Sequence, residues 1–312
     1  MAKKSRPQIW IEYQAVRTLL MVLRALPFSV AERIGLTAGN IGYAMLGNLR
    51  RVGERNLELA FPEKGADERS LILKSAFRNM GRVMAVLSRF GRLSPDNAHE
   101  LIEYTPEPEF AEAYEQTKMD GRGRIILGGH IGNWELQAFT YPMFFEPLTF
   151  LARRMDNPLI EAMVMQIRTR LGNRQIDKTN AAAPMLRTLR AGGTVGVLAD
   201  VNSHPKEGVF VPFFGIPACT ATGIAMLALR ANAVIVPMFA MWDADRNVYK
   251  IVHGDIIEPV KTGDRKRDIE ETTARCVAAT EAVIREFPDQ WIWIHRRWKT
   301  RPPGEPDLYQ ES

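Results

Sequence analysis

A histidine and a glutamate, His130 and Glu135, lie five positions apart in a glycine-containing stretch that links two apolar segments. An imidazole is the side chain best suited to remove a proton near neutral pH, and a nearby carboxylate can orient it. The surrounding glycines permit tight turns whose exposed backbone amides can bind an anion. The pair therefore predicts a general base, with a structural histidine in a glycine turn as the alternative.

The same spacing occurs a second time, at His253 and Glu258. The segment around this second pair is typical of an extended strand, and residues five apart on a strand point to opposite faces. We therefore expect the side chains of His253 and Glu258 not to meet.

The first pair is placed differently, since it follows a short apolar strand and precedes a helix. Asn133 can cap a helix that begins at Trp134, which puts Glu135 in the first helical turn. The positive end of the helix dipole favours an ionised carboxylate there. If His130 donates its Nδ1–H to Glu135, Nε2 is left free to act as the base.

Other chemistries find little support in the sequence. It contains no Gly-x-Ser-x-Gly elbow and no Walker-type phosphate loop, and Gly121-x-Gly123 precedes its strand instead of following it. Two cysteines, Cys219 and Cys276, are too few for a disulfide framework or a cysteine-rich metal site. We expect no metal and no cofactor, and a reducing compartment.

The elements around His130 alternate in type, which predicts an α/β fold with a mainly parallel sheet flanked by helices. In such sheets the functional site lies at the carboxyl ends of the strands, where His130 stands. The expected helices cover residues 8–26, 30–47, 49–60, 67–90, 108–117, 133–144, 157–171, 181–191, 219–231 and 266–286. The expected strands cover 101–104, 124–128, 148–152, 194–199, 208–212, 233–240 and 248–257.

The 312-residue chain has a formal net charge of +5, which suits an anionic partner. Its N-terminus combines basic residues with an apolar segment that charged residues interrupt, so a membrane span is not expected. Residues 1–28 instead predict a helix lying on an anionic membrane face, or one packed on its own domain. Residues 29–302 form the expected catalytic domain, and 303–312 a flexible tail.

The sequence around His130 resembles the active-site block of the lipid A biosynthesis late acyltransferases, the lauroyl and myristoyl transferase family with a His-x4-Asp/Glu pair. Further resemblances follow in the family's order and together span residues 10–302. The blocks that carry them are Asn48–Arg51 with Asn56–Pro62, Arg154–Pro158, Ala199–Asp200 with Gly208–Gly215, and the long signature Pro288–Pro302.

This resemblance implies a glycerolphosphate-acyltransferase-like fold at the cytoplasmic face of the inner membrane. It implies transfer of a fatty acyl chain from acyl-acyl-carrier protein to a hydroxyl of a phosphorylated lipid A precursor. The family also points to an arginine in the helix after Pro158, where Arg168 and Arg170 both fit, and to the aspartate Asp200. Asp200 then orients an arginine or the acceptor, unless it only caps a turn.

Two further groups of residues are candidates for substrate binding. A set of arginines suits phosphates or the acidic carrier protein, and an apolar run suits the wall of an acyl groove, although a core strand explains that run equally well. We expect His295 to be structural. The arginines are Arg153, Arg154, Arg296 and Arg297, and the apolar residues are Val209, Phe210, Phe213 and Phe214.

Two alternatives to the lipid A reaction remain open. Asn202 and Ser203 depart from the acidic and aromatic residues that many relatives carry after the aspartate, which bears on the acceptor. One alternative is an acyltransferase that uses acyl-CoA and acts on another glycolipid, an aminolipid or a lysophospholipid. The other is a non-catalytic membrane lipid-binding protein. We expect no nucleic-acid partner, because the basic residues are dispersed and form no recognised motif.

Overall fold

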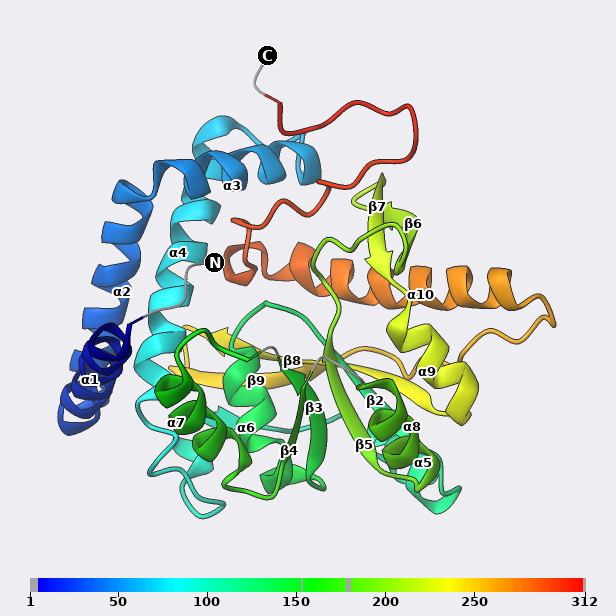
Figure 1. Cartoon of the computed structure of the whole chain (residues 1–312), viewed down its shortest axis with the longest axis horizontal. Coiled ribbons are helices and arrows are strands. Elements are labelled where there is room, and N and C mark those ends of the chain that lie inside the picture. The colour runs from blue at the N-terminus through cyan, green and yellow to red at the C-terminus, as the bar shows by residue number, and fades with distance from the viewer. Residues whose placement is uncertain (1–4, 153, 178–180, 311–312) are drawn as a thin grey trace.

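The computed structural model describes residues 5–152, 154–177 and 181–310, and shows a central sheet with helices on both faces (Figure 1). The helices are α1 (Arg6–Ala25), α2 (Phe28–Met45), α3 (Gly47–Ala60), α4 (Ala66–Leu87), α5 (Pro108–Met119), α6 (Trp134–Phe144), α7 (Pro158–Thr169), α8 (Ala182–Arg190), α9 (Gly223–Ala231) and α10 (Arg265–Glu286). The strands are β1 (Ile102–Glu103), β2 (Arg124–Gly128), β3 (Leu148–Ala152), β4 (Arg174–Asp177), β5 (Thr194–Leu198), β6 (Gly208–Phe213), β7 (Ile216–Ala221), β8 (Val234–Asp243) and β9 (Val248–His253).

Seven strands form the main sheet in the order β1-β9-β8-β2-β5-β3-β4. Neighbouring strands are parallel except β8 and β9, which run antiparallel. The expected mainly parallel sheet is therefore confirmed. Since β2 pairs with both β5 and β8, the carboxyl ends of these three strands lie side by side, which brings the loops that follow them together.

Apolar side chains on both faces of the sheet hold the helices in place. Ile126 of β2 packs in a cluster with residues of α4, α5 and α6, whereas Ile125 and Leu127 pack with residues of α8, α9 and α10. A strand buried on both faces reads as a continuous apolar run rather than an alternating one, which explains the sequence of β2.

The C-terminal segment after α10 returns to the main body and passes between α3 and the β6–β7 hairpin (Figure 1). Its Trp291, Trp293 and Trp298 are at most 1% exposed and pack in one cluster with residues of α3, α4 and α10. The backbone of Trp291 also forms an antiparallel bridge with Ile131, directly after His130. The C-terminal signature therefore forms part of the loop structure at the predicted site.

Two of the N-terminal helices pack by close backbone approach. A Cβ added to Gly81 of α4 would lie 1.9 Å from the carbonyl oxygen of Gly35 in α2, so only glycine fits at this crossing.

Helix α1 is tied to α7, because Asn157 Nδ2 donates to the carbonyl of Ile9 at 2.8 Å. The helix expected over 8–26 is confirmed as α1, while its membrane association remains a prediction. Among the described residues, no helix has the length and apolar character needed to cross a membrane.

Two strands, β4 and β7, were not expected from the sequence. β7 pairs antiparallel with β6, and the turn between them has Phe214 at φ 51° and Gly215 at φ 75°. A two-residue hairpin turn with two positive φ values normally has Asn or Gly at its first position. Because Phe214 occupies that position here, the sequence did not indicate a turn. The helix expected from residue 219 consequently begins at Gly223. β4 is an edge strand of four residues, of which three are polar, and gives little apolar signal.

Candidate active site

The loop between β2 and α6 carries His130 and is held on several sides. Asn133 caps α6 as predicted, because its side chain accepts a hydrogen bond of 3.0 Å from the amide of Leu136. Gly132 has φ +59°, and a Cβ there would lie 2.0 Å from the carbonyl oxygen of Ala240 in β8. The glycine is therefore required both for its backbone angle and for the close approach of the next strand.

The side chain that faces the imidazole of His130 is Asp200, which follows β5. His130 Nδ1 lies 2.9 Å from Asp200 Oδ1, and the His130 amide donates to Oδ2 at 2.7 Å. Trp291 Nε1 donates to the same Oδ2 at 2.8 Å. Since the Asp200 side chain is fully buried and accepts three hydrogen bonds, it is held rigidly as an acceptor. Nδ1 therefore carries the ring proton, and Nε2 is left as the basic nitrogen of the neutral ring.

The charges of the pair stabilise each other. Burial lowers the pKa of His130, but the charge and hydrogen bond of Asp200, and to a smaller extent the charge of Glu135, outweigh burial and raise that pKa overall. Burial raises the pKa of Asp200, and the interactions with His130 and Trp291 reverse this, so its pKa lies below the usual value. Asp200 is thus ionised when His130 acts as a base.

Glu135 does not take the position against the imidazole that the spacing predicts. Its carboxylate instead forms a two-pronged ion pair with Arg168, with Nε 2.9 Å from Oε2 and a second, short contact between the terminal nitrogen and Oε1. The expected hydrogen bond from His130 Nδ1 to Glu135 is therefore made with Asp200 in this structure. The reason is the strand order, which places the end of β5 beside the loop and leaves Glu135 facing α7.

The structure separates the two candidate arginines of α7. Arg168 lies at the site, with its side chain 15% exposed beside Glu135. Arg170 points elsewhere, because its guanidinium donates to the backbone carbonyls of Gly91 at 3.1 Å and Leu93. Arg168 is the arginine that can contact a substrate at His130.

An apolar cavity of about 250 Å³ opens beside His130 and lies between α6 and the strands β2, β5 and β3. Titratable side chains gather at one end of it, and the side chains that line the remainder are apolar except for Gln137 and Tyr141. The polar end has His130, Glu135 and Arg168, and the other lining residues are Ile126, Gly128, Trp134, Gln137, Ala138, Tyr141, Leu148, Phe150, Leu151, Ala152, Met155, Gly196, Val197 and Leu198.

The residues expected to line an acyl groove do not line this cavity. Phe213 and Phe214 are buried in the cluster formed with α3 and the C-terminal tryptophans, and Val209 packs against it. Phe210 lies on the same hairpin and is half-buried. The alternative interpretation of this run, a core strand, describes it better. The apolar wall of the cavity is supplied by α6, β3 and β5, in which lining residues such as Ala138, Leu148 and Phe150 gave no motif.

The predicted anion-binding arginines have different environments. Arg297 is 1% exposed and donates to the Cys219 carbonyl at 3.0 Å and to Thr220 Oγ1 at 2.6 Å. Burial lowers its pKa to about 10. The Arg297 guanidinium therefore makes its hydrogen bonds inside the protein and is not accessible to a phosphate at the surface. Arg296 and Arg154 are exposed, and Arg153 lies outside the described residues.

The second His-x4-Glu pattern does not form a pair, as expected. His253 Nε2 lies 2.6 Å from a carboxylate oxygen of Glu107, whereas Glu258 forms an ion pair with Arg122 at 2.5 Å. Within the described ranges, no group of three His, Cys, Asp or Glu side chains is arranged to hold a metal ion.

The C-terminal signature contributes two residues near the site. His295 Nε2 accepts from the amide of Asn202 at 2.8 Å, which supports the structural role expected for it. Trp291 was not predicted as a partner of Asp200. The only sequence signal is its place in the C-terminal signature Pro288–Pro302.

Comparisons with known proteins identify the family of the chain. The model of a family described as bacterial lipid A biosynthesis acyltransferase matches residues 2–300. A lipid A biosynthesis lauroyltransferase of Escherichia coli K12 is 30% identical over 304 residues, covering 97% of this chain and 96% of the relative. A palmitoleoyltransferase and a myristoyltransferase of lipid A biosynthesis from the same organism are 26% and 23% identical, covering 97% of this chain and 95% and 90% of themselves.

Proposed function

The chain belongs to the bacterial lipid A biosynthesis acyltransferase family, and on this premise we propose that it transfers a fatty acyl group from acyl-acyl-carrier protein to a hydroxyl of a phosphorylated lipid A precursor. The observation that carries the proposal is the position of His130. Its Nδ1 is held by buried Asp200, and its ring stands at the polar end of an apolar cavity.

The reaction needs a base and no covalent enzyme intermediate, because a thioester is already activated. Nε2 of His130 removes the proton of the acceptor hydroxyl, whose oxygen attacks the thioester carbonyl carbon. The tetrahedral intermediate collapses as the carbon–sulfur bond breaks, and the imidazolium returns its proton to the leaving thiolate. Asp200 stabilises the imidazolium between these two steps without itself taking the proton.

The ion pair of Glu135 and Arg168 has a separate role in this proposal. The guanidinium lines the cavity beside His130, where it can stabilise the oxyanion or bind a phosphate of the acceptor. Glu135 fixes the orientation of that guanidinium by accepting from two of its nitrogens. Glu135 thus supports catalysis through Arg168 as well as through its weaker charge effect on His130.

The apolar cavity is the place for the acyl chain. Met155 and Leu198 line the cavity near the carboxyl ends of β3 and β5 and are 37% and 38% exposed, so the cavity opens on the side of His130, and a chain that enters it leaves the thioester carbonyl beside His130. Burial of each methylene in such a site contributes about 0.8 kcal/mol. This replaces the β6–β7 hairpin as the proposed acyl-binding wall.

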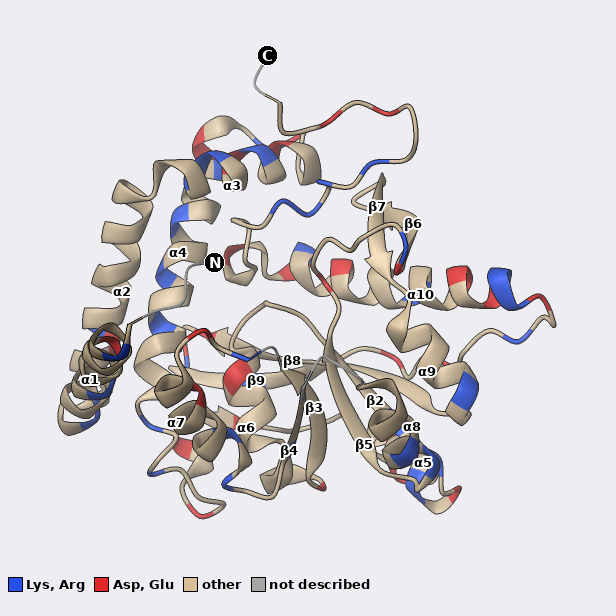
Figure 2. Ribbon diagram, in the orientation of Figure 1, with Lys and Arg blue, Asp and Glu red and all other residues tan. Residues whose placement is uncertain are grey.

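The acceptor lipid and the carrier protein require a membrane face and a basic surface. Trp10 and Ile11 of α1 are 57% and 61% exposed, and Met155, which lines the cavity mouth, is 37% exposed. Basic side chains run along α4, as Figure 2 shows. We therefore place the protein at the cytoplasmic face of the inner membrane, with exposed apolar residues in the lipid interface and cations facing anionic partners.

Mass spectrometry of lipid A from cells with and without the gene tests the proposal. We expect one acyl chain fewer on lipid A when the protein is absent, and restoration by the wild-type chain but not by His130→Ala. A His99→Ala variant is the matched control, because His99 is exposed and lies outside the cavity. An unchanged acylation pattern contradicts the lipid A assignment.

The donor is tested with purified protein. We expect transfer from acyl-acyl-carrier protein to exceed transfer from acyl-CoA at equal concentration. The reverse order favours the acyl-CoA-dependent alternative, and turnover with neither donor favours a lipid-binding protein.

A further inference from the structure

The apolar cavity beside His130 has a closed end at Tyr141 and Leu148, which are 1% and 3% exposed. Trp134, Ala138 and Tyr141 line the cavity from successive turns of one face of α6, and the seven-residue step from first to last covers about 10 Å. On the opposite side the lining of β3 runs from Ala152 back to Leu148, about 13 Å along a strand. Tyr141 and Leu148 therefore stand at the end opposite His130.

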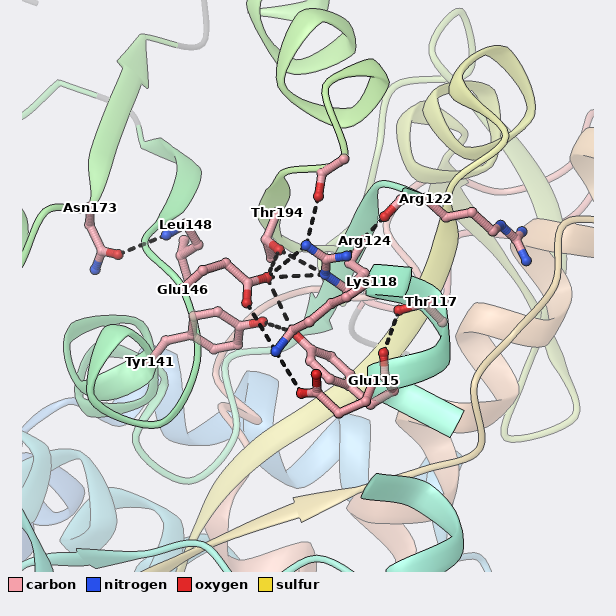
Figure 3. A network of polar contacts seen from close by, with 12 residues as sticks. Glu115, Thr117, Lys118, Arg122, Arg124, Tyr141, Glu146, Leu148, Asn173 and Thr194 are labelled. Carbon is pink, nitrogen blue, oxygen red and sulfur yellow. Dashed lines mark hydrogen bonds and ion pairs between the residues drawn. The ribbon is translucent and has the colours of Figure 1, made fainter. Parts of the chain in front are cut away.

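Tyr141 is fixed at this closed end by a buried polar network. Its hydroxyl lies 2.5 Å from the hydroxyl of Tyr114, and Tyr114 in turn donates to Glu146 Oε1 at 3.4 Å. Arg124 Nε lies 3.0 Å from the same carboxylate oxygen, to which the Thr194 hydroxyl also donates. Figure 3 shows Tyr141 reaching from α6 towards these side chains.

The two tyrosines and the arginine of the network are buried, whereas the Glu146 side chain is 27% exposed. Tyr141 and Tyr114 are 1% and 2% exposed, and Arg124 is 4% exposed. Displacing Tyr141 would leave the buried Tyr114 hydroxyl without its closest partner, and a buried polar group that loses its partner is costly. The hydroxyl also stays protonated, because burial raises the pKa of Tyr141 well above 10.

We propose that Tyr141, locked by the Tyr114–Glu146–Arg124 network, is the floor that sets the longest acyl chain the enzyme transfers. This rests on the proposed function, in which the cavity holds the acyl group. A donor whose chain is too long either leaves its thioester outside the reach of His130 or has to displace the floor. A floor backed by charged and hydrogen-bonded groups therefore gives a sharper limit than one made of mobile side chains.

The wall opposite α6 offers a second way to change the depth. Gly196 of β5 lines the cavity, and a Cβ there would approach Leu148 Cδ1 to 3.1 Å. Gly196→Val therefore fills space above the floor. Tyr141→Leu and Leu148→Ala remove side-chain volume at the closed end and deepen the cavity.

The experiment is a competition between acyl-acyl-carrier proteins of increasing chain length, with the products separated by mass spectrometry. We expect Tyr141→Leu and Leu148→Ala to raise the ratio of longer to shorter product by about tenfold or more, and Gly196→Val to lower it, since one methylene in an apolar pocket changes selectivity by roughly 10–200-fold. Tyr141→Phe keeps the ring but removes the hydroxyl that contacts Tyr114, so it should keep the preferred chain length of the wild type and make the upper limit less sharp. Transfer by the deepening variants with the wild-type chain preference overturns the proposal.

A second measurement separates this proposal from the catalytic one. Thermal stabilisation by fatty acids of increasing length reports the depth of the cavity without turnover. We expect the length of greatest stabilisation to increase in Leu148→Ala and decrease in Gly196→Val. If these shifts occur in a protein that transfers no acyl group, the floor is correct and the proposed reaction is wrong. If transfer occurs while neither the preference nor the stabilisation shifts, the floor is wrong and the reaction stands.

Discussion

At the scale of single residues, the carboxylate that holds the imidazole is not the one that the spacing predicts. Asp200 holds the imidazole of His130, and Glu135 holds the guanidinium of Arg168. The sequence pointed to His130 and Glu135 because they are close along the chain. It could not show that Asp200 meets His130, because 70 residues separate them and only the pairing of β2 with β5 brings them together.

The Asp200→Asn variant tests this division. Asp200 raises the pKa of His130, and the base acts in its neutral form, so activity increases as pH rises through that pKa. Removing the negative charge lowers the pKa, which moves the acid limb of the rate profile to lower pH. We expect kcat to fall by about 10²–10⁴-fold because the tautomer is no longer fixed. Acyl-transfer rates measured against pH give both the pKa of the acid limb and the fall in kcat.

Glu135→Gln is the comparison for that profile. Because its charge contributes less to the pKa of His130 than Asp200 does, we expect a smaller displacement of the acid limb and a loss of activity through misplaced Arg168. If the acid limb moved further in Glu135→Gln than in Asp200→Asn, Glu135 and not Asp200 would be the carboxylate that orients the imidazole of His130.

Trp291→Phe probes the third hydrogen bond to Asp200. The substitution keeps an aromatic ring in the core but removes the Nε1 donor 2.8 Å from Oδ2. A hydrogen bond to a charged acceptor contributes about 1.5–3 kcal/mol. We therefore expect a fall in kcat of about tenfold with little change in KM, measured by steady-state kinetics. A change confined to KM would indicate that Trp291 acts on substrate binding instead.

At the scale of elements, periodicity and caps predicted most of the helices and the strands of the parallel sheet. β2 was predictable because Ile125, Ile126 and Leu127 form an apolar run between glycines. The start of α6 was predictable because Asn133 is a typical helix cap. The β6–β7 hairpin was not, because its turn begins with Phe214 in a conformation that this residue type rarely adopts. The cavity wall had no signal either, since Leu148, Phe150 and Gly196 look like ordinary strand residues.

The α2–α4 crossing makes a prediction about stability. Gly81→Ala places a Cβ against the backbone of Gly35, so the helices must separate. We expect a loss of about 1–3 kcal/mol, which corresponds to a fall in Tm of several degrees. Gly47→Ala is the control, because a Cβ on Gly47 meets no atom within 4 Å and should leave Tm nearly unchanged. Equal melting temperatures for all three proteins would contradict the close packing of these helices.

At the scale of the whole molecule, α1 lies on the left of Figure 1, far from α5 at the lower right. If α1 lies on the membrane, the double variant Trp10→Glu/Ile11→Glu should bind vesicles containing anionic lipid several-fold more weakly than wild type in a sedimentation assay, with an unchanged Tm. Met119→Glu on α5 is the matched control, because Met119 is 79% exposed. Equal weakening by both changes would contradict a specific membrane face.

The proposed acyl transfer depends most on His130, which acts as its base. The direct measurement is the mass of a phosphorylated lipid A precursor after incubation with acyl-acyl-carrier protein and purified enzyme, sampled over time. We predict that wild type and His99→Ala add one acyl chain at similar rates, and that His130→Ala is slower by about 10²-fold or more. Addition of the chain by His130→Ala at a near-normal rate would contradict the account.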